Sequence, residues 1–274
     1  MSSIKTLVHI CSGMGNRFKC LLGALYVSDE VRIFWPTYLD KNMMSHTQAS
    51  IDPYADIIKN GVIEVKDNNE IGRLMKHEGF VVRNTHRWHD KLAIDFNFDL
   101  MRFQKERAAF HELAKRYLVP SDKVQAIYDA RIAAVSECKH GVFIRTGDTQ
   151  KQEYDWPFWK IEDFNINPDI KTFVVGDSPK VYEHFRNKPN VVCYLEQDYI
   201  YSGWPGHYAN MLLLAQCLRL TMPRVSTYSE MVYVLNGYKA QLDLVEKVTD
   251  RGKAYDSQSI HKMRFHLNKL KNGN

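Results

Sequence analysis

The chain has 274 residues, of which 45% are hydrophobic and 25% are charged, so it can bury the core of one large domain or two small ones. This composition excludes disorder as the main state. The formal net charge is +5, and residues 247–274 alone carry seven basic and two acidic side chains, so the rest of the chain is electrically balanced. A basic surplus confined to one end does not favour a dedicated nucleic-acid binder.

Membrane and redox signals point to a reduced, cytoplasmic protein. The apolar stretch at 6–11 is too short for a signal-peptide core or a membrane span, and we expect no transmembrane segment. The five cysteines are odd in number and widely scattered, with no CxxC pair and no spacing typical of zinc ligands.

The first part of the chain alternates short β-branched or aromatic runs with helical stretches, the pattern of an α/β structure. After the loop 12–16, apolar residues recur with helical spacing from Phe18 to Leu25, and Pro36 ends the next strand. We expect strands at 6–11, 31–35, 62–65 and 80–82, and helices from about 18 and at 70–77.

The second part repeats the alternation and predicts a parallel sheet. A helix from about 101 stops before Pro120, and Ser121 with Asp122 is typical of the N-cap of a helix that ends near 137. We therefore place a domain junction between residues 118 and 119. The expected elements that follow are strands at 141–145, 171–177 and 191–195, and helices at 178–186, 208–220 and 231–235.

A glycine-rich loop, G-M-G-N-R at 13–17, joins the first strand to the first helix. Backbone amides approach ligands at this position in α/β proteins. The loop is not a GxGxxG fingerprint, because Phe18 stands where the third glycine would be. A plain tight turn that uses Gly13 and Gly15 is the alternative interpretation.

The second motif is G-V-F-I-R-T-G-D at 141–148, in which a strand delivers Arg145 to its carboxyl end. An arginine fork there suits a diphosphate, and Asp148 could orient it. The alternative is a surface arginine before a Gly-Asp turn.

Two further motifs lie at predicted helix starts. Asp177 ends a strand and could accept a hydrogen bond from a base or ribose, or cap the following helix. Ser226, Thr227 and Ser229 could cradle a phosphate, whereas Thr227 with Glu230 also fits an ordinary capping box.

In this order the four motifs resemble those of the fucosyltransferase superfamily of GT-B glycosyltransferases, which includes α1,2-, α1,6-, protein O- and nodulation fucosyltransferases. The resemblance spans about residues 6–237. It implies two Rossmann-like α/β domains facing across a cleft. Residues 1–118 would form the acceptor side, and residues 119–274 the nucleotide-sugar donor side, with a C-terminal basic helix packing back.

The resemblance also assigns roles to individual residues. Those implied in catalysis are Arg145, Asn16 and Asp148, and the general base stays open among Asp148, Glu153, Asp155 and Asp52. Those implied in donor binding are Gly13, Gly15, Arg145, Asp177, His207, Ser226, Thr227, Tyr228 and Ser229. The chain departs from the superfamily at five positions. Arg17, Phe143, Ser178 and Tyr228 replace Gln, His, Asp and Ser, and Asn210 stands where an Asp often precedes the leucine-rich helix.

The activity implied is an inverting transfer of a sugar, best matched by fucose, from a GDP-sugar to a glycan hydroxyl. No Asp-x-Asp pair occurs in the chain, so we expect a reaction without metal and without a cofactor beyond the GDP-sugar co-substrate. The expected partners are the nucleotide-sugar donor and a glycan acceptor, with no nucleic acid. The alternative is a GT-B-like glycan- or nucleotide-binding protein that has lost catalysis, which Phe143, Arg17 and Ser178 suggest.

Overall fold

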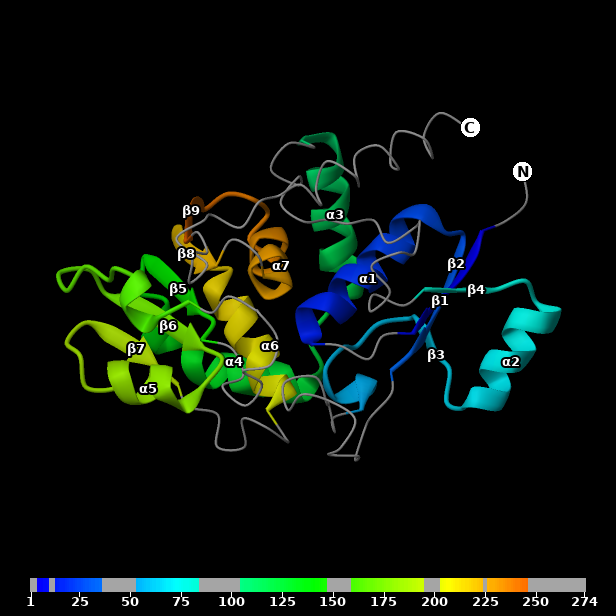
Figure 1. Cartoon of the computed structure of the whole chain (residues 1–274), viewed down its shortest axis with the longest axis horizontal. Helices are drawn as coiled ribbons and strands as arrows, with labels where there is room; N and C mark the ends of the chain where they lie inside the picture. The colour runs from blue at the N-terminus through cyan, green and yellow to red at the C-terminus, as the bar shows by residue number, and fades with distance from the viewer. Residues whose placement is uncertain are drawn as a thin grey trace, which may run out of the picture.

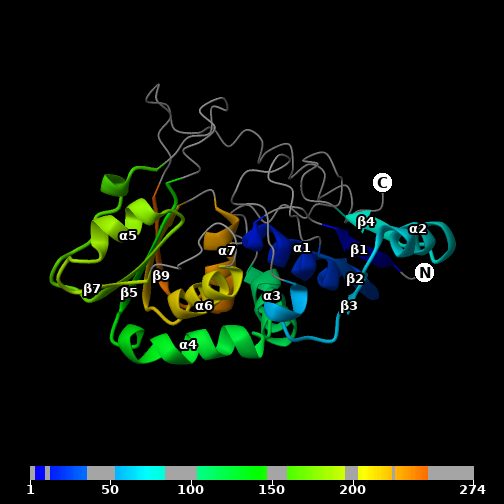
Figure 2. The same ribbon diagram turned by 90° about the horizontal axis from the view of Figure 1, so that it is seen from below.

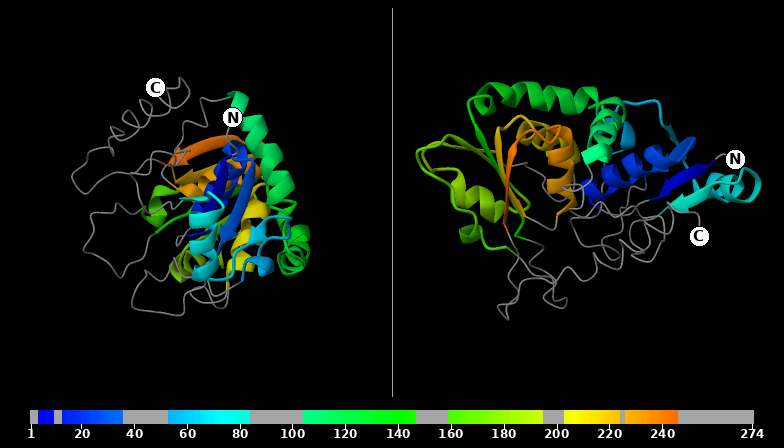
Figure 3. Two further views of the ribbon diagram at one scale, coloured as in Figure 1. Left: turned by 90° about the vertical axis from the view of Figure 1, so that its right-hand side faces the viewer. Right: turned by 90° about the horizontal axis from the view of Figure 1, so that it is seen from above.

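A computed structural model describes residues 4–9, 13–35, 53–83, 104–146, 159–194, 203–223 and 226–245. They form two parallel β-sheets with helices around and between them (Figure 1 and Figure 3). One sheet has the strand order β3-β2-β1-β4 and the other the order β7-β6-β5-β8-β9. The expected α/β class with parallel sheets is therefore confirmed.

The elements of the first sheet and its helices are β1 (Lys5–His9), α1 (Met14–Val27), β2 (Glu30–Phe34), the 3₁₀ turn η1 (Tyr54–Asp56), β3 (Ile63–Glu64), α2 (Asn68–His77), β4 (Val81–Arg83) and α3 (Gln104–Tyr117). Those of the second are α4 (Asp122–Val135), β5 (His140–Ile144), η3 (Ile161–Asp163), β6 (Thr172–Gly176), α5 (Pro179–Phe185), β7 (Val191–Cys193), α6 (Trp204–Leu214), β8 (Arg219–Pro223), α7 (Thr227–Leu235) and β9 (Gln241–Val245). Among these helices none is long and apolar enough to cross a membrane.

Most expected elements occur within a few residues of their predicted bounds. Ser121 is the N-cap of α4, and its hydroxyl accepts a hydrogen bond from the Val124 amide at 3.2 Å, as predicted. The helix expected at 208–220 is wrong at both ends, because α6 runs from Trp204 to Leu214. Strand β8, which was not predicted, follows and pairs with β5, and β9 was missed as well.

A single apolar cluster joins the two sheets. Val8 and Ile33 of the first sheet belong to the same buried cluster as Phe143 and Phe173 of the second. Between them the Phe18 ring of α1 meets the Tyr208 ring of α6 edge to face, with centroids 4.8 Å apart. The two sheets therefore share one hydrophobic core. The division of the chain into two domains after residue 118 stays a prediction.

The expected junction is fastened to the first half of the chain by backbone hydrogen bonds. The Lys59 amide donates to the Val119 carbonyl at 2.8 Å, and the Ser121 amide donates to the Ile57 carbonyl at 3.1 Å. Figure 2 shows α4 beginning beside the 3₁₀ turn η1. This corner holds the start of α4 against the segment that leads to β3.

Asn60 satisfies three groups at this corner. Its Oδ1 accepts from the Tyr54 hydroxyl and from the Val62 amide, each at 2.9 Å. Its Nδ2 donates to the Tyr117 carbonyl. One amide side chain thus joins η1, the approach to β3 and the end of α3.

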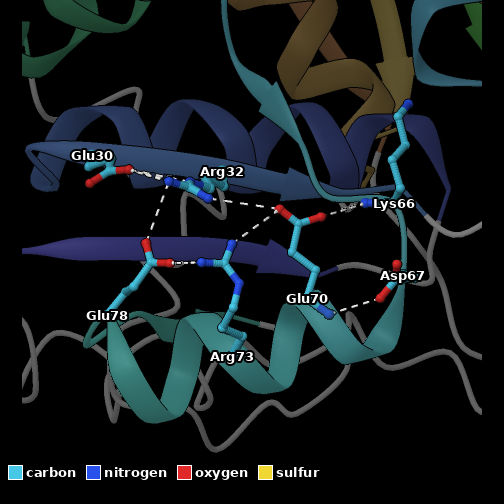
Figure 4. A network of polar contacts seen from close by, with 7 residues as sticks. All are labelled: Glu30, Arg32, Lys66, Asp67, Glu70, Arg73 and Glu78. Atoms are coloured by element: carbon cyan, nitrogen blue, oxygen red, sulfur yellow. Dashed lines mark hydrogen bonds and ion pairs between the residues drawn. The ribbon is translucent and has the colours of Figure 1, made fainter.

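Helix α2 is held over the first sheet by an ion-pair network (Figure 4). Arg32 of β2 lies 3.2 Å from Glu30, 3.9 Å from Glu70 and 3.6 Å from Glu78. At the start of α2, Asp67 accepts from the Glu70 amide at 2.8 Å while Glu70 accepts from the Lys66 amide at 3.2 Å. The N-cap Asp67 and the Glu70 side chain thus each bind a backbone amide and fix the start of α2.

Replacing Asn60 with Ala is expected to destabilise the protein by about 1–3 kcal/mol, because the Tyr54 hydroxyl and two backbone groups lose their partner. Urea unfolding followed by circular dichroism measures the change. Asn69→Ala is the matched control, since Asn69 is exposed on α2, and is expected to stay within about 0.5 kcal/mol of wild type. Equal stability of both variants would contradict the role of Asn60.

Candidate functional site

The N-terminal turns of α1 and α7 touch backbone to backbone, and both Figure 1 and Figure 2 show α1 beginning beside α7. A Cβ atom added at Gly15 would lie 2.6 Å from the Thr227 carbonyl carbon and 2.6 Å from the Tyr228 nitrogen. Real Cβ atoms do not approach backbone that closely, so this position requires glycine. The contact brings together two motifs predicted separately from the sequence.

A buried ion pair crosses the same interface. The Lys19 ammonium of α1 lies 2.9 Å from the Glu230 carboxylate of α7, and these side chains are only 10% and 5% exposed. The capping-box interpretation of Thr227 with Glu230 is therefore wrong. The N-cap of α7 is Ser226, and the carboxylate of Glu230 points to Lys19.

Two serine hydroxyls near the start of α7 are buried without a hydrogen-bond partner. Ser226 and Ser229 are 2% and 1% exposed, and neither Oγ atom is bonded. An orphaned buried hydroxyl costs about 1–3 kcal/mol, which a phosphate oxygen could recover. Neither α1 nor α7 has a side-chain cap, so their first-turn amides add to the positive ends of two helix dipoles.

Two of the departures from the superfamily pack against each other. The Phe143 and Tyr228 rings stack with centroids 4.3 Å apart and an interplanar angle of 27°. The Tyr228 hydroxyl donates to the His207 carbonyl at 3.1 Å, which brings the first turn of α6 to this cluster. Aromatic packing therefore joins β5, α7 and α6 where the superfamily motifs carry His and Ser.

Arg145 is the residue after β5, at the carboxyl end of the sheet. Phe143 belongs to the apolar cluster shared with α7, whereas Val142 and Ile144 belong to the cluster on the opposite face. Side chains alternate along a strand, so Arg145 continues the Phe143 face, toward α7. It is partly exposed and makes no hydrogen bond or ion pair with any residue that the structure describes.

Asp177 is bonded to the segment that follows β5. Its carboxylate accepts from the Thr146 amide at 2.8 Å and from the Thr146 hydroxyl at 3.0 Å, which fixes the backbone directly after Arg145. The N-cap of α5 is Ser178, so the helix-cap interpretation of Asp177 is wrong. The contact of Asp177 with a base or ribose stays a prediction.

The general-base candidates lie outside the described residues. Asp148, Glu153, Asp155 and Asp52 all fall in the gaps between the described ranges. Asn16 lies half-buried in the first turn of α1, beside Gly15. The assignment of a base is thus a prediction from the sequence.

Arg17, noticed in the sequence only as a departure, is 1% exposed. Its Cζ atom lies 4.4 Å from the Trp35 ring centroid and 4.9 Å from the Trp204 ring centroid. The two rings meet edge to face with centroids 5.6 Å apart, so the cation packs against both the residue that follows β2 and the first residue of α6. A buried arginine has no signature in the linear pattern, because its burial depends on Trp204, far along the chain.

Thiol and metal chemistry find little support in the described part of the chain. Burial raises the pKa of Cys193 and of Cys217 to about 12, so neither thiol ionises near neutral pH. No three His, Cys, Asp or Glu side chains gather as ligands among the described residues. Independence from metal is still a prediction, tested below.

No protein-family model matches the chain, and no curated protein matches its sequence. In structure the chain is similar to a variant of Arabidopsis thaliana FUT1 in complex with GDP, with a TM-score of 0.51, 12% identity, and coverage of 92% of this chain and 72% of that one. It is also similar to fucosyltransferase NodZ from Bradyrhizobium (TM-score 0.46, 16% identity, 86% and 94% coverage) and to POFUT1 (TM-score 0.47, 10% identity, 89% and 99% coverage). The FUT1 match shows that the chain has the fold of a GT-B fucosyltransferase, so the predicted resemblance is confirmed for the fold.

Gly15→Ala is expected to destabilise the protein by about 1–3 kcal/mol, because the new methyl group clashes with backbone atoms of α7, which, unlike a side chain, cannot change rotamer. Gly72→Ala in α2 is the control, since a Cβ there meets nothing within 4 Å. That control is expected to gain about 0.5–1 kcal/mol from helix propensity. Thermal unfolding of both variants measures the sign of the change in stability. A Gly15→Ala variant more stable than wild type would contradict the close approach of α1 and α7.

Proposed function

We propose that this protein is an inverting GT-B glycosyltransferase that moves a sugar, most simply fucose, from a GDP-sugar to a glycan hydroxyl. The observation that carries the proposal is the contact of Gly15 with Thr227 and Tyr228, which joins two helix N-termini beside β5, the strand that Arg145 follows. The fold shared with FUT1, whose structure contains GDP, supports a guanine nucleotide as the donor's leaving group.

The chemistry requires positive potential where the leaving diphosphate gathers charge. In an inverting transfer the acceptor hydroxyl attacks the anomeric carbon while the diphosphate leaves from the opposite face, so negative charge grows on the distal phosphate. First-turn amides of α1 and α7 and the hydroxyls of Ser226 and Ser229 would donate hydrogen bonds to those phosphate oxygens. Arg145 would bind two of them with its planar fork.

The remaining site residues have supporting roles in this proposal. Asn16 would orient the acceptor, and Asp177 would hold Thr146 so that Arg145 stays in place. His207 would contact the donor near Tyr228, which already bonds to its carbonyl. A base among Asp148, Glu153, Asp155 and Asp52 would take the acceptor proton, and Arg145 with the helix termini would replace a metal.

The alternative function is a nucleotide- or glycan-binding protein without turnover. The stacked pair of Phe143 and Tyr228 favours it, because aromatic packing stands where the superfamily motifs carry polar side chains. Such a protein would bind the donor and release no GDP. Incubation with GDP-fucose and a panel of glycans, with GDP release measured, distinguishes the two.

Arg145→Ala is expected to weaken GDP binding by about 10- to 100-fold, because a charge-assisted pair of hydrogen bonds to phosphate is lost. Isothermal titration of wild type and variant with GDP, GDP-fucose, UDP and CMP measures this, without metal and then with EDTA. We expect only the guanine compounds to bind wild type, and EDTA to change nothing.

The control for this titration is Arg186→Ala. Arg186 is the exposed C-cap of α5 and forms a surface ion pair with Glu183, so the GDP affinity of this variant is expected to equal that of wild type. A folded Arg145→Ala variant with unchanged affinity would contradict the role of Arg145. No nucleotide binding by wild type would contradict the transferase proposal altogether.

A further inference from the structure

We propose that Lys19 is a positioning residue for the donor diphosphate, because it neutralises the buried carboxylate of Glu230 behind the anion site. The inference rests on the proposed function and concerns the electrostatics of that same site. Lys19 would not touch the donor; it would act through Glu230.

The first step concerns the place of Glu230. It lies in the first turn of α7, three residues after Thr227, and its amide donates to the Ser226 carbonyl at 3.1 Å. Its side chain is 5% exposed, so water screens its charge poorly. A bare carboxylate here would repel a diphosphate bound at the N-terminus of the same helix.

The second step concerns the place of Lys19. It follows Gly15 by one helical turn, so its side chain leaves α1 next to the Gly15 contact with Thr227. Its ammonium reaches the Glu230 carboxylate at 2.9 Å and is itself 10% exposed. The same docking of α1 on α7 therefore assembles the two helix N-termini and neutralises the carboxylate behind them.

The third step separates charge from packing. A buried ion pair is weak evidence for stability, since apolar residues of similar volume often serve as well. If the pair acts through charge, removing the Lys19 charge must lower the binding affinity more for a ligand whose phosphates carry more charge. If the pair acts through packing alone, the affinity for a neutral ligand must fall by the same factor.

The test titrates wild type, Lys19→Met, Glu230→Gln and the double variant with guanosine, GMP and GDP. For Lys19→Met we expect GDP affinity to fall by about tenfold or more, GMP affinity to fall less, and guanosine affinity to stay the same. The double variant, which has a neutral pair of similar shape, is expected to return to within about threefold of wild type for GDP. Lys115→Met removes the same charge from an exposed pair on α3 and is expected to change nothing.

Removing one partner of a buried pair can prevent folding, so circular dichroism accompanies each titration. If Lys19→Met does not fold, Glu230→Gln decides alone: with Lys19 retained, GDP should bind more tightly than to wild type while guanosine stays unchanged. Equal losses for guanosine and GDP, or a folded double variant that does not recover, would overturn the role of Lys19 and leave the proposed function standing. Absence of GDP binding by wild type would overturn both.

Discussion

The contact of the α1 and α7 N-termini is the constraint on which the rest of the structure depends. Only glycine at position 15 lets the α7 backbone approach this closely, and the buried pair of Lys19 and Glu230 forms across the same interface. The shared apolar cluster then extends through Phe18 and Tyr208 into both sheets. Since α1 follows β1 while α7 follows β8, this one contact sets the strand ends of one sheet against those of the other.

Three of the departures from the superfamily motifs are packed against aromatic rings. Phe143 and Tyr228 stack on each other, and Arg17 packs against both Trp35 and Trp204. At these three positions the side chains make ring contacts within the core. Position 143 therefore offers no polar side chain to a donor, and the anion site that we propose would consist of Arg145, the hydroxyls near the start of α7 and the helix amides.

The polar groups with unmet hydrogen bonds are also informative, because most buried polar groups in folded proteins are paired. Ser226 and Ser229 break that rule in the turn where α1 and α7 meet, while Asn60 obeys it at the junction between the halves. Local rules fail most often at functional sites, where a ligand completes the bonding. At the junction, in contrast, the polar groups around Asn60 are hydrogen-bonded to one another, as expected for a structural role.

The sequence by itself determined the α/β class, most elements and the motifs, because these depend on local periodicity and on residues a few positions apart. It misplaced α6 and missed β8. A helix that is buried on nearly all sides shows no 3.6-residue pattern of apolar residues, and the mainly apolar sequence of α6 continues into β8, so the pattern does not mark where the helix ends. Tertiary structure decided that Gly15 meets Thr227, that Glu230 pairs with Lys19 and that Asp177 holds Thr146. Each of these is a contact between distant segments, and its partner is chosen by how helices and strands pack, which no local pattern encodes.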